Sequence, residues 1–259
     1  MSTPKKSAVA RNPMMVIHLA IAAILVVVLI PQLRHAALDV IFGEDSPSSS
    51  APAPVASGDS YYEVTGTAER TYEAAEGEIG YCPLDDLERA VCAYGELTHE
   101  LRAGERGADR EDITKDPAGW GHNEKVEIAS EDGSIIYRGY MFNRSHLVAD
   151  SLGGHPEMDN MVTGTRTQNV GFNNAEGSGA GGMGYTEEIA RDYLDSEDSI
   201  GCPLYYGVTP NYTGDELLPR TVTVDIQSCD QKIDERVVVS NTANGYVIDY
   251  TDGSFAEEG

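Results

Sequence analysis

Five side chains in the middle of the chain have the types and the spacing that phosphodiester cleavage needs. His146 can act as a general base, because imidazole titrates near neutral pH. Arg144 precedes it by two residues, so an extended chain places both side chains on one face, where a guanidinium can bind a phosphate. Asn160 and Asn169 offer amide oxygens and Glu187 offers a carboxylate, ligands that suit a hard divalent cation. Together these are the parts of a one-metal phosphodiesterase.

The net charge of the chain limits the ways in which it could bind a nucleic acid. Its 259 residues include 18 Lys and Arg against 43 Asp and Glu, which gives a formal net charge of −25. Proteins that coat nucleic acids without regard to sequence attract phosphates with broad basic surfaces. The charge therefore disfavours a protein that coats nucleic acids, but it does not disfavour an enzyme that binds phosphates through a metal ion.

The sequence around the five side chains resembles a known family. The strings NRSH, HLVADSLGG and NMVTGTRTQNV carry His146, Asn160 and Asn169, and a Gly-Met pair precedes Glu187. These strings are similar to the DRGH or DRSH motif and to the motifs that follow it in the DNA/RNA non-specific endonucleases, which have a ββα-metal active site. The similarity is strongest to the bacterial DNA-entry nuclease branch and extends over about residues 80–251.

The resemblance implies a role for each of the five side chains. His146 would be the general base that takes a proton from water as the water attacks phosphorus in line. Asn169 would be the direct protein ligand of Mg²⁺, which Mn²⁺ can replace, and Glu187 would act on the metal through water. Asn160 would position the metal or the phosphate, and Arg144 would contact the phosphate. The expected products carry 5′-phosphates.

Three positions need separate comment. Asn143 stands where the family motif has Asp, which keeps a hydrogen-bonding geometry but loses the charge, so we expect lowered rather than abolished activity. Glu188 is the alternative to Glu187, because the glycine-rich stretch 171–184 makes the spacing variable. Arg166 is expected to bind substrate, with a salt bridge to one of the many carboxylates as the alternative.

These observations predict an endonuclease that hydrolyses DNA, with RNA as a second substrate, without strong sequence specificity. The alternative is a non-catalytic cell-surface module that keeps the same fold for binding. A binding module does not need His146, Asn160, Asn169 and Glu187 together. The intact set therefore favours the enzyme.

The elements that must position these residues indicate one α+β domain, a ββα-metal nuclease core with an antiparallel sheet and helices. Helical spacing of apolar residues and short segments rich in Val, Ile, Tyr and Thr distinguish the two kinds of element. We predict helices within 81–101 and at 185–194, a hairpin of 125–129 with 134–141, and sheet strands at 204–209, 221–227, 236–240 and 246–250.

The cysteines predict two disulfides, because an even number outside the membrane points to an oxidising compartment. If the strands on either side of Asp215 form a hairpin, Cys202 and Cys229 lie across its open end, which leaves Cys82 to pair with Cys92. A zinc site is the alternative. The chain has no CxxC pair and no histidine within four residues of any cysteine, which disfavours zinc.

The N-terminal part of the chain predicts a membrane anchor. Residues 14–33 form an apolar run long enough to span a bilayer as one transmembrane helix, and the basic tail 1–13 before it belongs in the cytoplasm. Residues 34–75 predict a disordered stalk, and residues 76–259 the extracellular nuclease domain. A cleaved signal peptide is the alternative, which would release a secreted protein.

Overall fold

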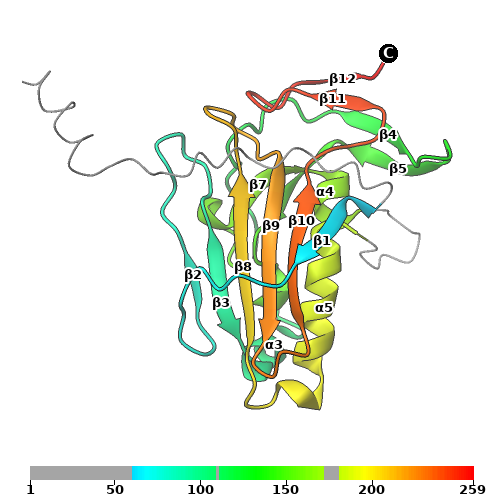
Figure 1. The fold of residues 1–259 in the computed structure, drawn as a ribbon. Helices are drawn as coiled ribbons and strands as arrows, with labels where there is room; N and C mark the ends of the chain where they lie inside the picture. Colours follow the sequence, from blue (N-terminus) through cyan, green and yellow to red (C-terminus); the bar gives the residue numbers. More distant parts are fainter. Residues whose placement is uncertain (1–59, 109–110, 172–180) are drawn as a thin grey trace, which may run out of the picture. The chain divides into compact units, whose positions relative to one another are not determined.

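An antiparallel sheet forms the framework of the described residues, 60–108, 111–171 and 181–259 of this computed structural model. Within them, six strands are hydrogen-bonded in the order β1-β10-β9-β8-β3-β2 (Figure 1). Helices accompany this sheet, so the fold is α+β, as the sequence predicts. The strands are β1 (Tyr62–Gly66), β2 (Ile79–Tyr81), β3 (Ala93–Leu97), β8 (Leu204–Asn211), β9 (Thr221–Ser228) and β10 (Asp234–Ser240).

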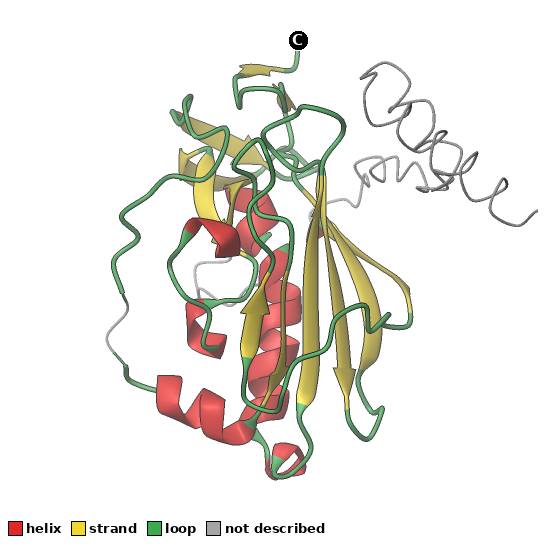
Figure 2. Cartoon of the chain, turned by 90° about the vertical axis from the view of Figure 1, so that its left-hand side faces the viewer, coloured by secondary structure: helices red, strands yellow, loops and turns green. Residues whose placement is uncertain are grey.

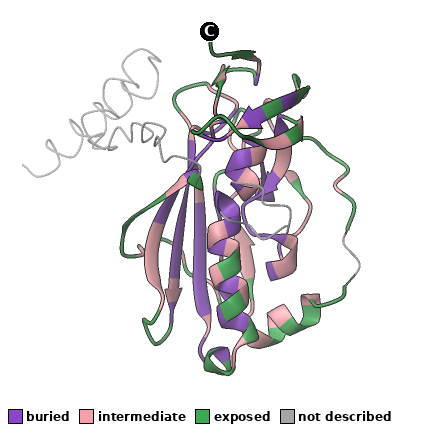
Figure 3. Ribbon diagram, turned by 90° about the vertical axis from the view of Figure 1, so that its right-hand side faces the viewer, coloured by how far each residue is buried: buried purple, intermediate pink, exposed green. Residues whose placement is uncertain are grey.

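One long helix, α5 (Met183–Asp195), packs against one face of the sheet (Figures 1 and 2). Alternate side chains of the central strands are buried against the helix in one layer. In Figure 3 the central strands are coloured mostly as buried. Burying one aliphatic side chain of this size contributes roughly 1.5–3 kcal/mol, so the layer is a main source of stability. Its fully buried members include Val222, Val224, Ile226, Ala190 and Leu194. The predicted helix and the predicted central strands are confirmed.

The opposite face of the sheet is partly covered by the segment that follows β1. The Glu69 N–H donates to the Asp225 carboxylate at 2.9 Å, and the Arg70 guanidinium lies 4.6 Å from the centre of the Tyr205 ring. Strand β1 itself pairs with β10. The predicted start of the folded domain at residue 76 is therefore too late, because short strands with few apolar residues give a weak sequence signal.

Three two-stranded sheets lie in the same described residues. They are β4 (Lys125–Ala129) with β5 (Ile135–Tyr140), β6 (Phe142–His146) with β7 (Met161–Thr165), and β11 (Tyr246–Ile248) with β12 (Phe255–Glu257). The first confirms the predicted hairpin. The strand predicted at 246–250 forms as β11 but pairs with β12, outside the main sheet. A second apolar cluster that includes Ile128, Met141 and Phe142 supports these hairpins.

Short helices complete the described elements. After β7 the chain enters α4 (Arg166–Val170) and later α5, so β6, β7 and these helices follow one another in ββα order. The others are α3 (His99–Glu105) and the 3₁₀ turns η2 (Asp150–Leu152), η3 (Met158–Asn160) and η4 (Glu197–Ser199). The glycine-rich stretch before α5 lies mostly outside the described residues.

The helical prediction for residues 81–101 is mostly wrong. Residues 82–92 form a loop closed by a disulfide, and 93–97 are strand β3, which pairs with β2 and β8. Only α3 is helical, with Thr98 as its N-cap. The apolar spacing does not produce a helix here, because Leu87 and Val91, which are spaced for a helix face, are exposed on the loop.

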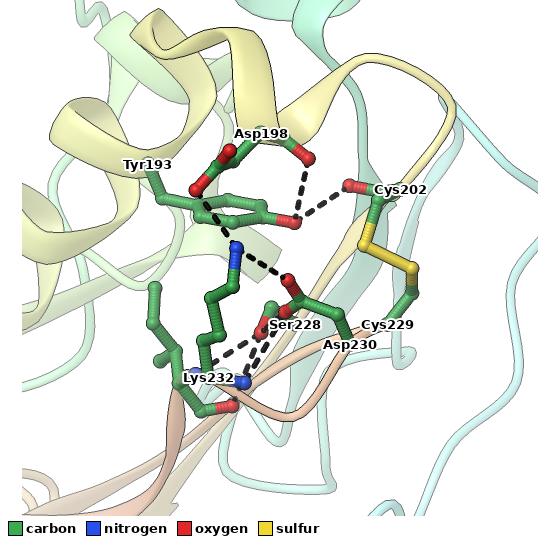
Figure 4. Close-up of a disulfide and its surroundings, with 8 residues drawn as sticks. Tyr193, Asp198, Cys202, Ser228, Cys229, Asp230 and Lys232 are labelled. Atoms are coloured by element: carbon green, nitrogen blue, oxygen red, sulfur yellow. Dashed lines mark hydrogen bonds and ion pairs between the residues drawn. A yellow bond between two sulfur atoms is a disulfide. The ribbon is translucent and has the colours of Figure 1, made fainter.

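Both predicted disulfides form, Cys82 with Cys92 and Cys202 with Cys229. No free cysteine remains, so the zinc alternative is wrong. Around the second bridge, the Tyr193 hydroxyl donates to the Cys202 carbonyl at 3.1 Å, and Lys232 pairs with Asp198 at 2.9 Å (Figure 4). These contacts tie the end of α5 to the turn between β9 and β10.

The predicted anchor, residues 14–33, lies outside the described residues, as does the stalk before residue 60. Among the residues that are described, no helix has the length and apolar character needed to cross a bilayer.

One buried asparagine joins the β6–β7 hairpin to the end of β10. The Asn241 side chain accepts from the Thr165 N–H at 2.8 Å and donates to the carbonyls of Thr163 and Pro219, at 3.1 and 2.8 Å. Asn241 is fully buried, so water cannot replace these bonds if the side chain is removed.

Asn241→Ala is therefore expected to lower the free energy of unfolding by about 2–4 kcal/mol, because three buried backbone groups lose their partner. Urea denaturation measures this loss. The control is Asn211→Ala, whose half-buried amide donates only to two threonine hydroxyls and should cost about 1 kcal/mol. Equal losses in the two variants would contradict the role given to Asn241.

Candidate active site

A cavity of about 820 Å³ collects most of the side chains that the sequence singles out. Its lining includes Asn143, Arg144 and His146 from β6, Asn169 from α4 and Glu187 from α5. Segments more than 40 residues apart in the chain thus contribute to one site. An imidazole, an amide oxygen, a carboxylate and a guanidinium thus share one solvent-accessible space.

Strand β6 delivers the histidine. It pairs with β7 in a register that sets His146 opposite Met161, at the end of the strand. His146 keeps 7% of its surface exposed, enough to reach the cavity while the ring is held by its surroundings. Arg144, two residues earlier, lines the same cavity, as the alternation of an extended strand predicts.

Asn169 is oriented by a neighbour that sequence analysis missed. The fully buried Ser145 hydroxyl donates to the Asn169 side-chain oxygen at 3.0 Å. Thr165, the last residue of β7, is the N-cap of helix α4, and its hydroxyl accepts from the Gln168 N–H at 2.9 Å, which fixes this short helix to the strand. The available signal was position, because Ser145 lies between two candidate residues in the NRSH string.

A glycine allows the two helices of the site to approach each other. At Gly182, just before α5, a Cβ atom would lie 2.3 Å from the Gln168 carbonyl oxygen and 2.5 Å from that of Thr167. Its φ of 58° also lies in the left-handed region, which favours glycine. Any larger residue would push α5, and Glu187 with it, away from α4.

Glu187 lies near the start of α5, and its side chain lines the cavity. Arg191, one helical turn later, lies 3.3 Å from its carboxylate and 3.5 Å from the Ser151 hydroxyl. The arginine therefore connects Glu187 to the 3₁₀ turn that follows β6. Glu188 is exposed and does not line the cavity, so the structure places Glu187 there and not its neighbour.

Arg144 is held by two contacts. Its Nε donates to the Asp116 carboxylate at 2.7 Å, and its guanidinium lies 4.8 Å from the centre of the Trp120 ring. Asp116 lies 28 residues before Arg144 and shares no motif with it, so no pattern in the sequence indicates this pair. Held in this way, the guanidinium can meet a phosphate with little loss of conformational entropy.

Two predicted residues do not line the cavity. Arg166 lies over the ring of Tyr137, 5.2 Å from its centre, and burial lowers the pKa of its guanidinium from the ordinary value. Asn160 is fully buried: its side chain accepts from the Val148 N–H at 2.9 Å and donates to the carbonyls of Val148 and His155 at 3.0 and 2.8 Å. Asn160 therefore braces the chain that follows His146 and is not part of the cavity lining.

The donor set suits a cation that keeps most of its water. The cavity offers the Asn169 amide oxygen and the Glu187 carboxylate, both oxygen ligands of the kind that Mg²⁺ takes in small number. Across the described part of the chain, no three His, Cys, Asp or Glu side chains cluster as a metal cage. The residues present thus fit a hydrated divalent ion held by one or two protein groups.

Comparison with known proteins adds independent information. Residues 69–230 match the family described as DNA/RNA non-specific endonuclease. A curated relative, the deoxyribonuclease of Streptococcus dysgalactiae subsp. equisimilis, is 30% identical over 246 residues, which cover 84% of this chain and 72% of the relative.

Solved structures of nucleases are also similar to this chain. The Sda1 nuclease, solved with a bound zinc ion, is 31% identical with a TM-score of 0.68, over 77% of this chain and 98% of that one. NucA from Streptococcus agalactiae, solved with a magnesium ion, is 21% identical with a TM-score of 0.55, over 75% of this chain and 84% of that one. The second likeness concerns the fold alone.

The two asparagines make a testable contrast. Asn160→Ala is expected to lower the free energy of unfolding by about 2–4 kcal/mol, because it removes three buried bonds, whereas Asn169→Ala should cost about 1 kcal/mol. Chemical denaturation in the presence of a chelator measures both without any contribution from bound metal. A larger loss in Asn169→Ala would contradict the bracing role of Asn160.

Proposed function

Because this chain belongs to the family of DNA/RNA non-specific endonucleases, we propose that its cavity is a metal-dependent active site for phosphodiester hydrolysis. The substrate is DNA, with RNA as a second substrate, cleaved without strong sequence specificity. The observation that carries the proposal is the convergence of His146, Asn169 and Glu187 on one cavity from β6, α4 and α5.

In the proposed reaction, His146 accepts a proton from a water molecule as that water attacks phosphorus in line with the departing 3′ oxygen. Arg144, fixed by Asp116 and Trp120, orients the phosphate. The products then carry 5′-phosphates. Ser145 and Asn160 are positioning residues: the first orients Asn169, and the second holds the backbone after His146.

A divalent cation completes the proposed site. Asn169 would hold it directly and Glu187 through water, and when bound it supplies positive charge for the phosphate and the leaving oxygen. We assign Mg²⁺, which Mn²⁺ can replace, because oxygen donors suit hard cations. The zinc ion in the Sda1 structure supports a divalent ion in this cavity.

We further propose that the enzyme acts outside the cell, tethered to the membrane through residues 14–33. The two disulfides support an oxidising compartment. The anchor rests on the apolar run and the preceding basic residues of the sequence. Cleavage after that run would instead release a secreted form.

Plasmid cleavage by the purified protein is expected to require a divalent cation and to stop in excess EDTA. Asn169→Ala should raise the Mg²⁺ concentration for half-maximal cleavage by about tenfold, because it removes the direct ligand. Asn160→Ala, as control, should leave that concentration unchanged. Undiminished cleavage in EDTA would refute metal dependence, and a shift in the Asn160 variant alone would reverse the two assignments.

His146→Ala is expected to slow cleavage by about a hundredfold or more at saturating Mg²⁺, the usual scale for loss of a general base. His155→Ala is the matched control, because His155 follows on the same segment, pairs with Asp159 and does not line the cavity. Its activity should remain close to the parental value. Near-parental activity in a folded His146→Ala protein would show that another group is the base.

A further inference from the structure

Aromatic side chains contribute to the lining of the cavity. Of the described residues, Trp120, Tyr137, Tyr140 and Phe142 line it together with His146. Trp120 and Tyr137 are partly buried against the second apolar cluster, which explains their presence. Tyr140 is different, because 53% of its surface is exposed. A large aromatic ring left open at a concave site is typical of a ligand-binding surface.

A cation lies over the rings of Trp120, Tyr137 and Tyr140. The distances from the cation to the ring centre are 4.8 Å for Arg144 over Trp120, 5.2 Å for Arg166 over Tyr137 and 5.5 Å for Lys125 over Tyr140. Lys125 does not line the cavity, although Tyr140 does. The lysine thus holds the Tyr140 ring in place and leaves the ring in contact with the cavity.

Charge alone gives this cavity little hold on a polyanion. Among the described residues that line the cavity, Arg144 is the only Lys or Arg, and it is already paired with Asp116. Asp150 and Glu187 contribute carboxylates to the same lining. Stacking on an aromatic ring needs no net positive charge, so it can supply affinity where phosphate attraction is weak.

We propose that Tyr140 stacks on an unpaired nucleobase of the substrate, so that the cavity binds single-stranded or locally melted nucleic acid more tightly than intact duplex. The inference rests on the proposed function, because it concerns the same cavity. In a duplex each base is already stacked on its neighbours, and exposing its face to Tyr140 costs unstacking energy. Any base can stack, so the contact adds no strong sequence preference.

The test measures binding in EDTA, where the proposed cleavage stops. A fluorescently labelled oligothymidylate is titrated with the protein and followed by anisotropy, while the single tryptophan of the chain, Trp120, reports occupancy of the cavity. An abasic strand of the same length and a blunt duplex serve as comparisons. We expect saturable tryptophan quenching by oligothymidylate and about tenfold weaker binding of the abasic strand.

Variants in strand β5 test whether Tyr140 is the ring that stacks on the base. Tyr140→Ala should raise the Kd for oligothymidylate by about tenfold, with little effect on the duplex, whereas Tyr140→Phe keeps the ring and should restore binding. Ile135→Ala is the control, because Ile135 is exposed on the same strand and does not line the cavity. Thermal unfolding of each variant verifies that the hairpin is intact.

Two results would overturn the inference: an unchanged Kd in folded Tyr140→Ala, or an abasic strand that binds as tightly as oligothymidylate. Neither result depends on whether the cavity is catalytic. Failure of the proposed function would instead appear as plasmid cleavage that does not respond to metal or to His146→Ala. The two failures are therefore distinguishable.

Discussion

The β6–β7 hairpin is held in place by asparagine side chains that bond its backbone, and the site depends on this constraint. Asn123 accepts from the Phe142 N–H at 2.9 Å and donates to the carbonyl of the same residue at 3.0 Å, at the start of β6. Asn160 does the same for Val148 just after the strand, and Asn241 pins β7. A carboxamide can satisfy a donor and an acceptor at once. Two of the three are fully buried, so their bonds are shielded from water.

This fixed hairpin explains how a small set of polar residues can form a reactive site on an acidic chain. His146 and Ser145 are adjacent on a strand that cannot slide, and Ser145 in turn sets the direction of the Asn169 amide. The contact between α4 and α5 at Gly182 brings Glu187 to the same cavity. Polar side chains that are fixed in this way do not need to reorganise during the reaction. Their positions are set by the hairpin and the helices, and not by a basic surface.

Local patterns in the sequence predicted the parts of the fold that local chemistry determines. The long helix α5, the β4–β5 hairpin, the central strands and both disulfides follow from periodicity, turn residues and strand geometry. Strand β3 did not, because a disulfide loop and pairing with β8 override its helical spacing. The sequence also indicated His146, Asn169 and Glu187, whereas Asp116 and Tyr140 entered the site through tertiary contacts that no local pattern encodes. Asn160 also lies within a motif, but its side chain bonds the backbone after His146 and does not line the cavity.

The proposed active site depends on one divalent cation bound in the cavity at Asn169. Anomalous diffraction from crystals soaked in Mn²⁺ tests it most directly, because manganese scatters anomalously and can replace Mg²⁺ at oxygen ligands. We expect one strong peak about 2.2 Å from the Asn169 side-chain oxygen, with Glu187 bonded to it through water, and no such peak in crystals of Asn169→Ala. A peak that persists in Asn169→Ala crystals, or one that lies away from His146 and Asn169, would contradict it.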